Sequence, residues 1–203
     1  MTGLLGQFGP IDIYLFDQIL RGRIAPGMRV LDAGSGNGRN LVYLLQAGYE
    51  VFAADADAEV IAAVGDLART LAPHLPAANF RIEPAEAMSF PAESVDVVLS
   101  VAVLHFARDD QHFDAMLQRM WRILRPGGIF FCRLASSIGI EDRVTPRVGR
   151  WHLLPDGSER YLVDEAMLLD RTQQVGGELL DPIKTTIVQG KRSMTTWVLR
   201  KHP

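Results

Sequence analysis

This 203-residue sequence has little cysteine, no long apolar run and a small net charge, and each of these features excludes some classes of protein. A single cysteine excludes an internal disulfide, so nothing points to an oxidising compartment. The longest apolar run, residues 95–106, contains Asp96, Ser100 and His105 and is too short to span a bilayer. The net charge of −3 gives no reason to expect nucleic acid or an anionic membrane as a general partner. Because the first residues also lack the basic start and apolar core of a signal peptide, we expect a cytoplasmic protein.

The sequence does contain enough apolar residues, 48%, for one globular domain with a substantial core. Short apolar runs alternate with segments of helical periodicity, which predicts a parallel sheet with helices on both faces. Right-handed crossovers then place the carboxyl ends of the strands at one edge, where ligands bind. The expected strands are residues 28–31, 50–54, 79–82, 94–100 and 129–134. The expected helices are residues 10–23, a segment from 40 onward, 57–71, 109–124 and 164–175.

A glycine-rich turn lies between the first expected strand and the helix after it. Its sequence is Asp32-Ala33-Gly34-Ser35-Gly36-Asn37-Gly38-Arg39-Asn40. A strand, a glycine turn and a helix in succession gather backbone N–H groups around a negatively charged group, and glycine permits close backbone approach. The next strand ends at Asp55, about twenty residues after the first glycine, where an acid can accept bonds from both ribose hydroxyls. The pattern predicts a site for a nucleoside ligand.

The glycine spacing distinguishes between two classes of nucleoside-binding protein. The dinucleotide fingerprint G-x-G-x-x-G needs a glycine at Arg39, but the glycine stands one residue earlier. The pattern D-x-G-x-G-x-G, opened by Asp32, resembles the first motif of class I S-adenosylmethionine-dependent methyltransferases. Asp55, residues 85–87 and the Arg-Pro-Gly-Gly segment at 125–128 extend this resemblance. Residues 36–51 are similar, more particularly, to the tellurite-resistance and thiopurine methyltransferase-like branch.

The resemblance implies an α/β fold: a three-layer Rossmann-like sandwich whose mostly parallel seven-stranded sheet ends in an antiparallel C-terminal hairpin. The residues themselves predict the hairpin, because two β-rich runs, 183–188 and 194–199, flank a polar turn. We expect a single domain, 1–203, with an N-terminal helical cover (1–25) and a cofactor-binding core (26–134). A substrate-side part, 135–203, begins with a long polar loop over 135–157.

The resemblance also implies S-adenosylmethionine as the cofactor and assigns residues to it. Its carboxylate would lie against the N–H groups of residues 34–38, and Asp55 would bind the ribose. Pro84 stands where many relatives carry an aspartate that binds the adenine amino group, so adenine recognition would depend on the backbone near Ala85 and Glu86. The expected cofactor-binding residues are Asp32, Ala33, Gly34, Ser35, Gly36, Asn37, Gly38, Arg39, Asn40, Asp55, Ala56, Ala85, Glu86, Ala87 and Ser100.

We expect the methyl acceptor to be a small molecule, either an anion or a soft nucleophile, bound by a monomer or homodimer. His105 follows the fourth strand at the substrate edge and is the candidate general base, with a packed structural histidine as the alternative. Tyr14, Arg133 and Arg192 are the other candidate substrate-binding residues, alongside His105 itself. No residue spacing predicts a metal site. The alternatives are a non-catalytic binder of the same nucleoside and an NAD-dependent oxidoreductase, which would need a different glycine spacing.

Overall fold

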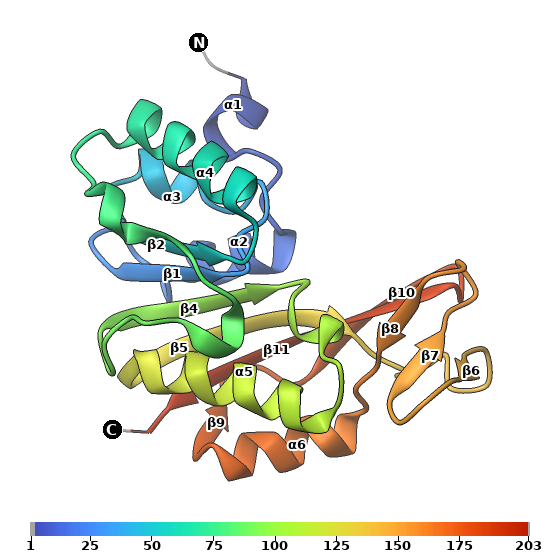
Figure 1. Ribbon diagram of the computed structural model, residues 1–203. Coiled ribbons are helices and arrows are strands. Elements are labelled where there is room, and N and C mark those ends of the chain that lie inside the picture. The colour runs from blue at the N-terminus through green and yellow to red at the C-terminus, as the bar shows by residue number, and fades with distance from the viewer. Residues whose placement is uncertain (1–2, 203) are drawn as a thin grey trace.

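The most apolar segments of the chain form the strands at the centre of the sheet. In the computed structural model, which describes residues 3–202, β4 is buried along its whole length and lies between β1 and β5. The order is β10-β11-β5-β4-β1-β2-β3, with β11 antiparallel to both β5 and β10, and β9 pairs with β11 (Figure 1). The strands of this sheet are β1 (Arg29–Ala33), β2 (Glu50–Asp55), β3 (Phe80–Ile82), β4 (Val95–Val101), β5 (Leu124–Ala135), β9 (Gly177–Leu179), β10 (Lys184–Val188) and β11 (Arg192–Lys201). The expected mostly parallel sheet with a terminal hairpin is confirmed.

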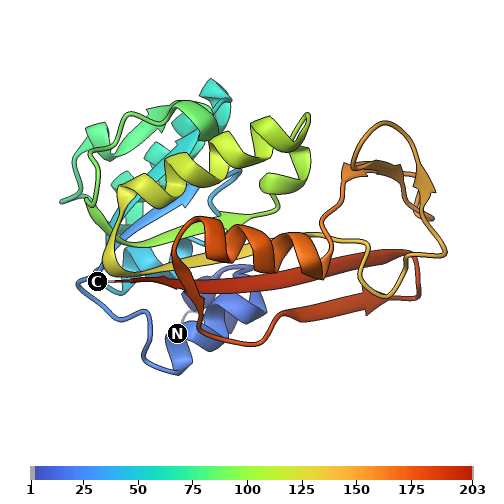
Figure 2. The same cartoon turned by 90° about the horizontal axis from the view of Figure 1, so that it is seen from below.

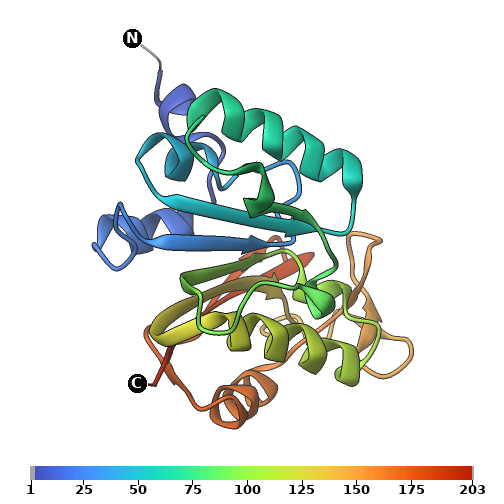
Figure 3. The same cartoon turned by 60° about the vertical axis from the view of Figure 1, so that its left-hand side comes forward.

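Helices cover both faces of the sheet because neighbouring strand residues point in opposite directions. Val30 packs in a cluster with residues of α2, α3 and α4, whereas Leu31 belongs to the cluster that includes α5 and α6. These two layers lie above and below the sheet in Figures 1 and 3. The helices are α1 (Leu4–Phe8), α2 (Ile13–Leu20), α3 (Val42–Gln46), α4 (Ala58–Leu71), α5 (Asp110–Ile123) and α6 (Glu165–Gln174). Short 3₁₀ turns are η1 (Ala77–Asn79), η2 (Ala85–Ala87) and η3 (Leu104–Phe106).

An aspartate begins each of the four longest helices. The side chains of Asp12, Asp57, Asp109 and Asp164 accept hydrogen bonds from the first free N–H groups of α2, α4, α5 and α6. Such a cap contributes about 1 kcal/mol to helix stability. The cap also explains one correction: the first expected helix, 10–23, is shorter, because α2 starts only after Asp12 and ends at Leu20. The helix α1 lies before that range and was not predicted. The helix after the glycine turn is shorter than expected too, since it begins at Val42 rather than at residue 40.

The expectation of a long loop over residues 135–157 was wrong, because part of that segment is a second, small sheet. Strands β6 (Thr145–Pro146), β7 (Trp151–Leu153) and β8 (Glu159–Tyr161) pair antiparallel and project beyond the end of the large sheet (Figure 2). The Trp151 indole N–H donates to the carbonyl of Arg108 at 3.0 Å, which attaches this sheet to the segment after η3. Strands of two or three residues are too short to produce a recognisable periodicity.

Among residues 3–202, every helix falls short of the length and apolar character needed to cross a membrane. The expected division into a cover, a core and a substrate-side part stays a prediction, and its outermost bounds, residues 1 and 203, lie outside the described residues.

Candidate active site

The glycine turn after β1 takes a backbone path that other residues rarely adopt. Gly34, Gly36 and Gly38 have φ angles of +81°, +50° and +72°, all in the left-handed region. At Gly34 a β-carbon would also clash with the side chain of Val103, which follows β4. The turn therefore needs glycine both for its conformation and for the close approach of a neighbouring segment.

The end of β2 holds this turn in place. The N–H groups of Gly34 and Ser35 donate to the Ala54 carbonyl at 2.8 and 3.2 Å. One carboxylate oxygen of Asp55 accepts the Gly36 N–H at 3.0 Å, and the other accepts the Asp57 N–H at 3.1 Å. Asp55 thus binds the glycine turn from the end of the neighbouring strand, and it lines a cavity there.

Asp32 is a buried carboxylate without a hydrogen-bond donor. Its side chain is 1% exposed, and neither oxygen has a partner among residues 3–202. Burial raises the pKa of Asp32 to about 7. The positive charge of Arg39 acts to lower this pKa, and the negative charge of Asp55 acts to raise it further. The Ser35 hydroxyl, also buried, lacks a partner in the same part of the chain. A cationic or hydrogen-bond-donating group is needed here, because unpaired buried acceptors cost free energy.

A cavity of about 490 Å³ opens beside the glycine turn at the carboxyl edge of the sheet. In its wall, His112 Nε2 lies 3.1 Å from a carboxylate oxygen of Glu86. Burial acts to raise the pKa of Glu86, but hydrogen bonds from its own backbone and from His112 outweigh burial and lower it. The lining residues are Gly34, Asp55, Ala56, Pro84, Ala85, Glu86, Ala102, Val103, Phe106, Arg108, His112 and Met116.

A second cavity, of about 240 Å³, adjoins the first and shares Ala102 and Phe106 with it. Ala102 has φ +64°, an uncommon conformation for a residue with a side chain, at the point between the two cavities. The second cavity is otherwise lined by His105, Ala135, Leu154, Ser158, Arg160, Arg192 and Met194. The two cavities therefore meet at Ala102 and Phe106.

His105 lies in η3, just after β4 at the carboxyl edge of the sheet, which is the position that the sequence predicts. Its side chain is 5% exposed, and its Nδ1 accepts the N–H of Ala135 at 3.1 Å. Burial, reinforced by the positive charges of Arg160 and Arg192, lowers the pKa of His105 to about 4. At neutral pH this histidine is therefore an uncharged side chain in a positively charged surrounding.

The other predicted substrate residues have different surroundings. Arg192 lines the second cavity and binds a carboxylate oxygen of Asp156 at 2.9 Å. Arg133 instead donates to the buried Asp12 carboxylate at 2.7 Å, and its guanidinium lies 5.0 Å from the ring centre of Tyr14. The Tyr14 hydroxyl is 2.5 Å from that of Thr186. Neither Arg133 nor Tyr14 lines either cavity.

Several predicted cofactor residues lie behind the cavity wall rather than on it. Asn40 accepts the Asp12 N–H at 3.0 Å, and Ser100 is fully buried on β4 opposite Cys132. Burial raises the pKa of the Cys132 thiol, so this cysteine is inert. The predicted cofactor residues outside the lining are Asp32, Ala33, Ser35, Gly36, Asn37, Gly38, Arg39, Asn40, Ala87 and Ser100.

Sequence reasoning missed most of the wall that follows β4 and all of the contribution from β8. The missed residues are Pro84, Ala102, Val103, Phe106, Arg108, His112 and Met116 in the first cavity, and Ala135, Leu154, Ser158, Arg160 and Met194 in the second. The position of Phe106, Arg108 and His112 just after a central strand is a signal that could have found them. Nothing local in the sequence marks Arg160.

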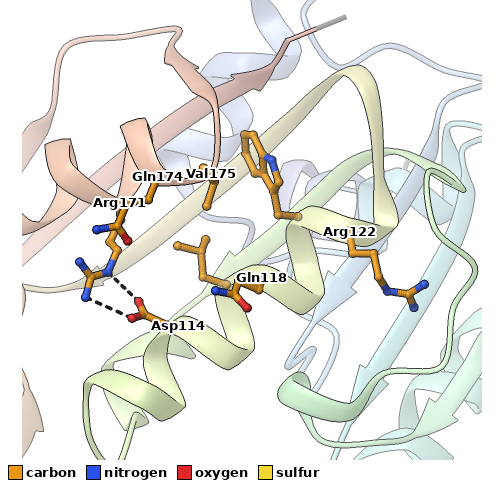
Figure 4. A pocket seen from close by; sticks show the side chains of 8 residues that line it. Asp114, Gln118, Arg122, Arg171, Gln174 and Val175 are labelled. Atoms are coloured by element: carbon orange, nitrogen blue, oxygen red, sulfur yellow. Dashed lines mark hydrogen bonds and ion pairs between the residues drawn. The ribbon is translucent and has the colours of Figure 1, made fainter.

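A groove of about 340 Å³ lies elsewhere, between α5 and α6 (Figure 4). Arg171 bonds Asp114 across it at 2.6 Å, and Trp121 and Val175 complete its apolar side. The groove shares no lining residue with the two cavities at the sheet edge, so it is not part of this site. Within residues 3–202, no group of three or more His, Cys, Asp or Glu side chains is placed to hold a metal ion.

Comparison with known proteins agrees with this geometry. Residues 31–132, from β1 to β5, match the methyltransferase domain family, and the chain belongs to that family. The resemblance to class I S-adenosylmethionine-dependent methyltransferases is thereby confirmed, together with S-adenosylmethionine as the cofactor. The glycine turn, the partnerless Asp32 carboxylate and Asp55 beside the cavity fit that cofactor, which has an ammonium group and a ribose.

The similar proteins act on different acceptors. Ubiquinone biosynthesis O-methyltransferase of Chelativorans sp. (strain BNC1) is 30% identical over 140 residues, covering 66% of this chain and 52% of that protein. The tRNA 5-carboxymethoxyuridine methyltransferase of Escherichia coli (strain K12) is 27% identical over 124 residues, covering 61% and 46%. The chain spans about half the length of the curated relatives it matches.

A solved structure shows the same fold over nearly the whole chain. Burkholderia thailandensis 1,6-didemethyltoxoflavin-N1-methyltransferase, with bound 1,6-didemethyltoxoflavin and S-adenosylhomocysteine, has a TM-score of 0.71 at 20% identity. The similarity covers 93% of this chain and 76% of that one.

Proposed function

We propose that the protein transfers a methyl group from S-adenosylmethionine to a small-molecule acceptor. The observation that carries this proposal is the adjacency of two cavities of about 490 and 240 Å³, one beside the glycine turn and one beside His105. The larger cavity would take the cofactor and the smaller one the acceptor. Ala102 and Phe106, which border both, would line the path between them.

The chain's own residues would bind and orient the two molecules. The partnerless Asp32 carboxylate would take the cofactor ammonium, Asp55 the ribose, and residues 85–86 the adenine. S-adenosylmethionine, when bound, supplies a methyl group on a positively charged sulfur. An acceptor atom would take the methyl group by in-line displacement, and the electrons of the broken carbon–sulfur bond would stay on the sulfur. The task of the protein is then alignment and exclusion of water. The residues of the glycine turn that do not line the cavity, other than Asp32, would act by holding the turn in shape.

A nucleic-acid acceptor is a second candidate, and the similarity to a tRNA methyltransferase favours it. The net charge of −3 and the small size of the second cavity favour a small molecule instead. The finer resemblance to the tellurite-resistance and thiopurine branch, the cytoplasmic location and a monomeric or homodimeric state stay predictions, as does a purely binding role as the alternative to catalysis.

Thermal unfolding tests cofactor binding directly. S-adenosylhomocysteine should raise the melting temperature and NAD should not, because a ligand stabilises only the protein that binds it. Asp55→Asn should weaken S-adenosylhomocysteine binding about 10- to 100-fold, since hydrogen bonds to a charged group contribute about 1.5–3 kcal/mol. The matched control is Asp57→Asn, which keeps a good helix cap and does not line the cavity. Stabilisation by NAD alone would contradict the proposal.

Labelled-methyl transfer separates an enzyme from a binder. A panel of carboxylic acids, phenols, thiols and unmodified tRNA, each incubated with labelled S-adenosylmethionine, should yield label in the small-molecule fraction. Label in tRNA alone would favour the second candidate. Cofactor binding with no transfer to any acceptor would favour the purely binding role.

A further inference from the structure

Two arginines give the smaller cavity, the one beside His105, a positively charged wall. Arg160, on β8, and Arg192, at the start of β11, both line it. Arg192 is partly neutralised by Asp156, whereas Arg160 makes no ion pair with any carboxylate of residues 3–202. A guanidinium without a counterion at the wall of a cavity is a site for an anionic group.

The cavity also offers a flat apolar surface beside that charge. The Arg160 guanidinium lies 5.1 Å from the ring centre of Phe106, whose ring is 4.6 Å from that of His105. Phe106 is 53% exposed, so its ring is available to a ligand. Leu154 and Met194 complete the apolar part of the wall. Such a surface suits a planar group that carries an oxyanion.

The hydrogen bond to Ala135 determines which proton His105 can offer. An N–H donor occupies Nδ1, so Nδ1 carries no proton, and in the neutral ring the proton must be on Nε2. The burial and the two positive charges that lower the pKa of His105 to about 4 keep the ring neutral. A ring of this kind donates a hydrogen bond from Nε2 and cannot accept a proton there.

On this basis we propose that the acceptor is a small planar molecule with a carboxylate or phosphate, held by Arg160 and by the Nε2–H of His105. The inference rests on the proposed function, because it assigns the acceptor class of the same site. His105 then orients the acceptor as a hydrogen-bond donor, in place of the general-base role that the sequence suggests. Arg192 adds to the positive field and, through Asp156, stays fixed at the rim.

Binding of simple probes to the S-adenosylhomocysteine-saturated protein tests the anion site. Benzoate and phenyl phosphate are the anionic probes, and benzamide is the uncharged probe of similar shape. At least one anion should bind about tenfold or more tightly than benzamide, and the tighter of the two identifies the carboxylate or the phosphate as the source. Equal binding of all three probes, or none, would overturn the inference.

The arginine variants locate the site. Arg160→Gln should weaken binding of the favoured anion about 10- to 100-fold, and Arg160→Lys should give an intermediate loss because it keeps the charge but not the planar fork. Arg147→Gln is the control, since Arg147 belongs to the same segment but pairs with Glu159 and lines neither cavity. An equal loss in Arg147→Gln would show that the effect is a general change of charge and would overturn the inference.

The same titrations without S-adenosylhomocysteine keep the two proposals separate. If S-adenosylhomocysteine does not bind, the proposed function fails, while anion binding that depends on Arg160 still supports the charged cavity. If S-adenosylhomocysteine binds and no anion does, the inference alone fails. Each result therefore rejects one of the two proposals and leaves the other standing.

The role of His105 has its own spectroscopic test. A two-bond ¹H–¹⁵N spectrum of the imidazoles should show His105 with its proton on Nε2 and no titration between pH 6 and 8. His105→Gln, which can still accept from Ala135 and donate toward the cavity, should keep anion affinity within about threefold, whereas His105→Leu should lose about tenfold. A proton on Nδ1, a titration in that range, or equal behaviour of the two variants would overturn the donor role.

Discussion

The buried Asp32 carboxylate gives the protein a pH-dependent stability that a single substitution should remove. Burial raises its pKa from the ordinary value of 3.8 to about 7. The folded state thus retains a proton that the unfolded state releases. The contribution of Asp32 to stability is complete below pH 3.8, decreases as the pH rises toward 7, and is constant above that. Since one pKa unit corresponds to 1.36 kcal/mol, the total loss is about 4 kcal/mol.

Urea unfolding of the wild type and of Asp32→Asn at several pH values measures this loss. All other titrating groups cancel in the difference between the two proteins. The free energy of unfolding of Asp32→Asn minus that of the wild type should therefore increase by about 2.5 kcal/mol between pH 5 and pH 8. The control is Asp142→Asn, which removes a carboxylate at an exposed position. A flat or falling difference for Asp32→Asn would refute the reasoning.

Cofactor binding should reverse this effect, because the ammonium of S-adenosylhomocysteine favours the ionised carboxylate. Calorimetry in buffers of different ionisation enthalpy should then show release of about one proton on binding near pH 5.5, and less near pH 8. The affinity should rise up to about tenfold per pH unit below the pKa of Asp32. Asp32→Asn should bind weakly and release no proton, and proton release unchanged in this variant would place the titrating group elsewhere.

Three further outcomes follow from the packing. Gly34→Ala should lose at least about 1–2 kcal/mol of stability in denaturant, because its backbone is left-handed, whereas Gly65→Ala, with open space in the middle of α4, should gain up to about 1 kcal/mol. Arg133→Met should cost about 3 kcal/mol, because it removes the ion pair that Arg133 makes with the buried Asp12 carboxylate at 2.7 Å. The cost should be much smaller when Asp12→Asn is already present, which a double-mutant cycle measures, and additive losses would exclude coupling. Labelling of Cys132 by a thiol reagent should proceed only as fast as the protein opens, so rapid labelling under native conditions would contradict its burial.

The glycine turn and Asp55 beside the larger cavity could be predicted from the sequence because they are local. One continuous turn after β1 supplies the left-handed glycines, and the next strand ends at Asp55. The sequence could not tell which residues of that turn border the cavity and which, such as Asn40, only hold the turn in shape. That distinction depends on tertiary contacts, here the bond from Asp12.

The smaller cavity could be predicted only in outline, because segments distant in the sequence build it. Arg133 was expected near the substrate from its place at the end of β5, but Asp12, 121 residues away, binds it. Arg160 could not be found, since β8 has three residues and no detectable alternation. The hairpin could be predicted from two long runs and a turn between them, although Arg192, expected in the turn, is the first residue of the second strand.

The small sheet β6–β8 leaves and rejoins the large one at a single point, because Ser136 and Val163 form a parallel bridge. The segment between Ser136 and Val163 thus has its two ends side by side. Its length can change without moving the strands of the large sheet. Leu154, Ser158 and Arg160 come from that segment, whereas every residue around the larger cavity comes from the region between Gly34 and Met116. Grafting the segment between Ser136 and Val163 from one homologue to another would therefore replace three residues of the smaller cavity, while His105 and every residue around the larger cavity stayed unchanged.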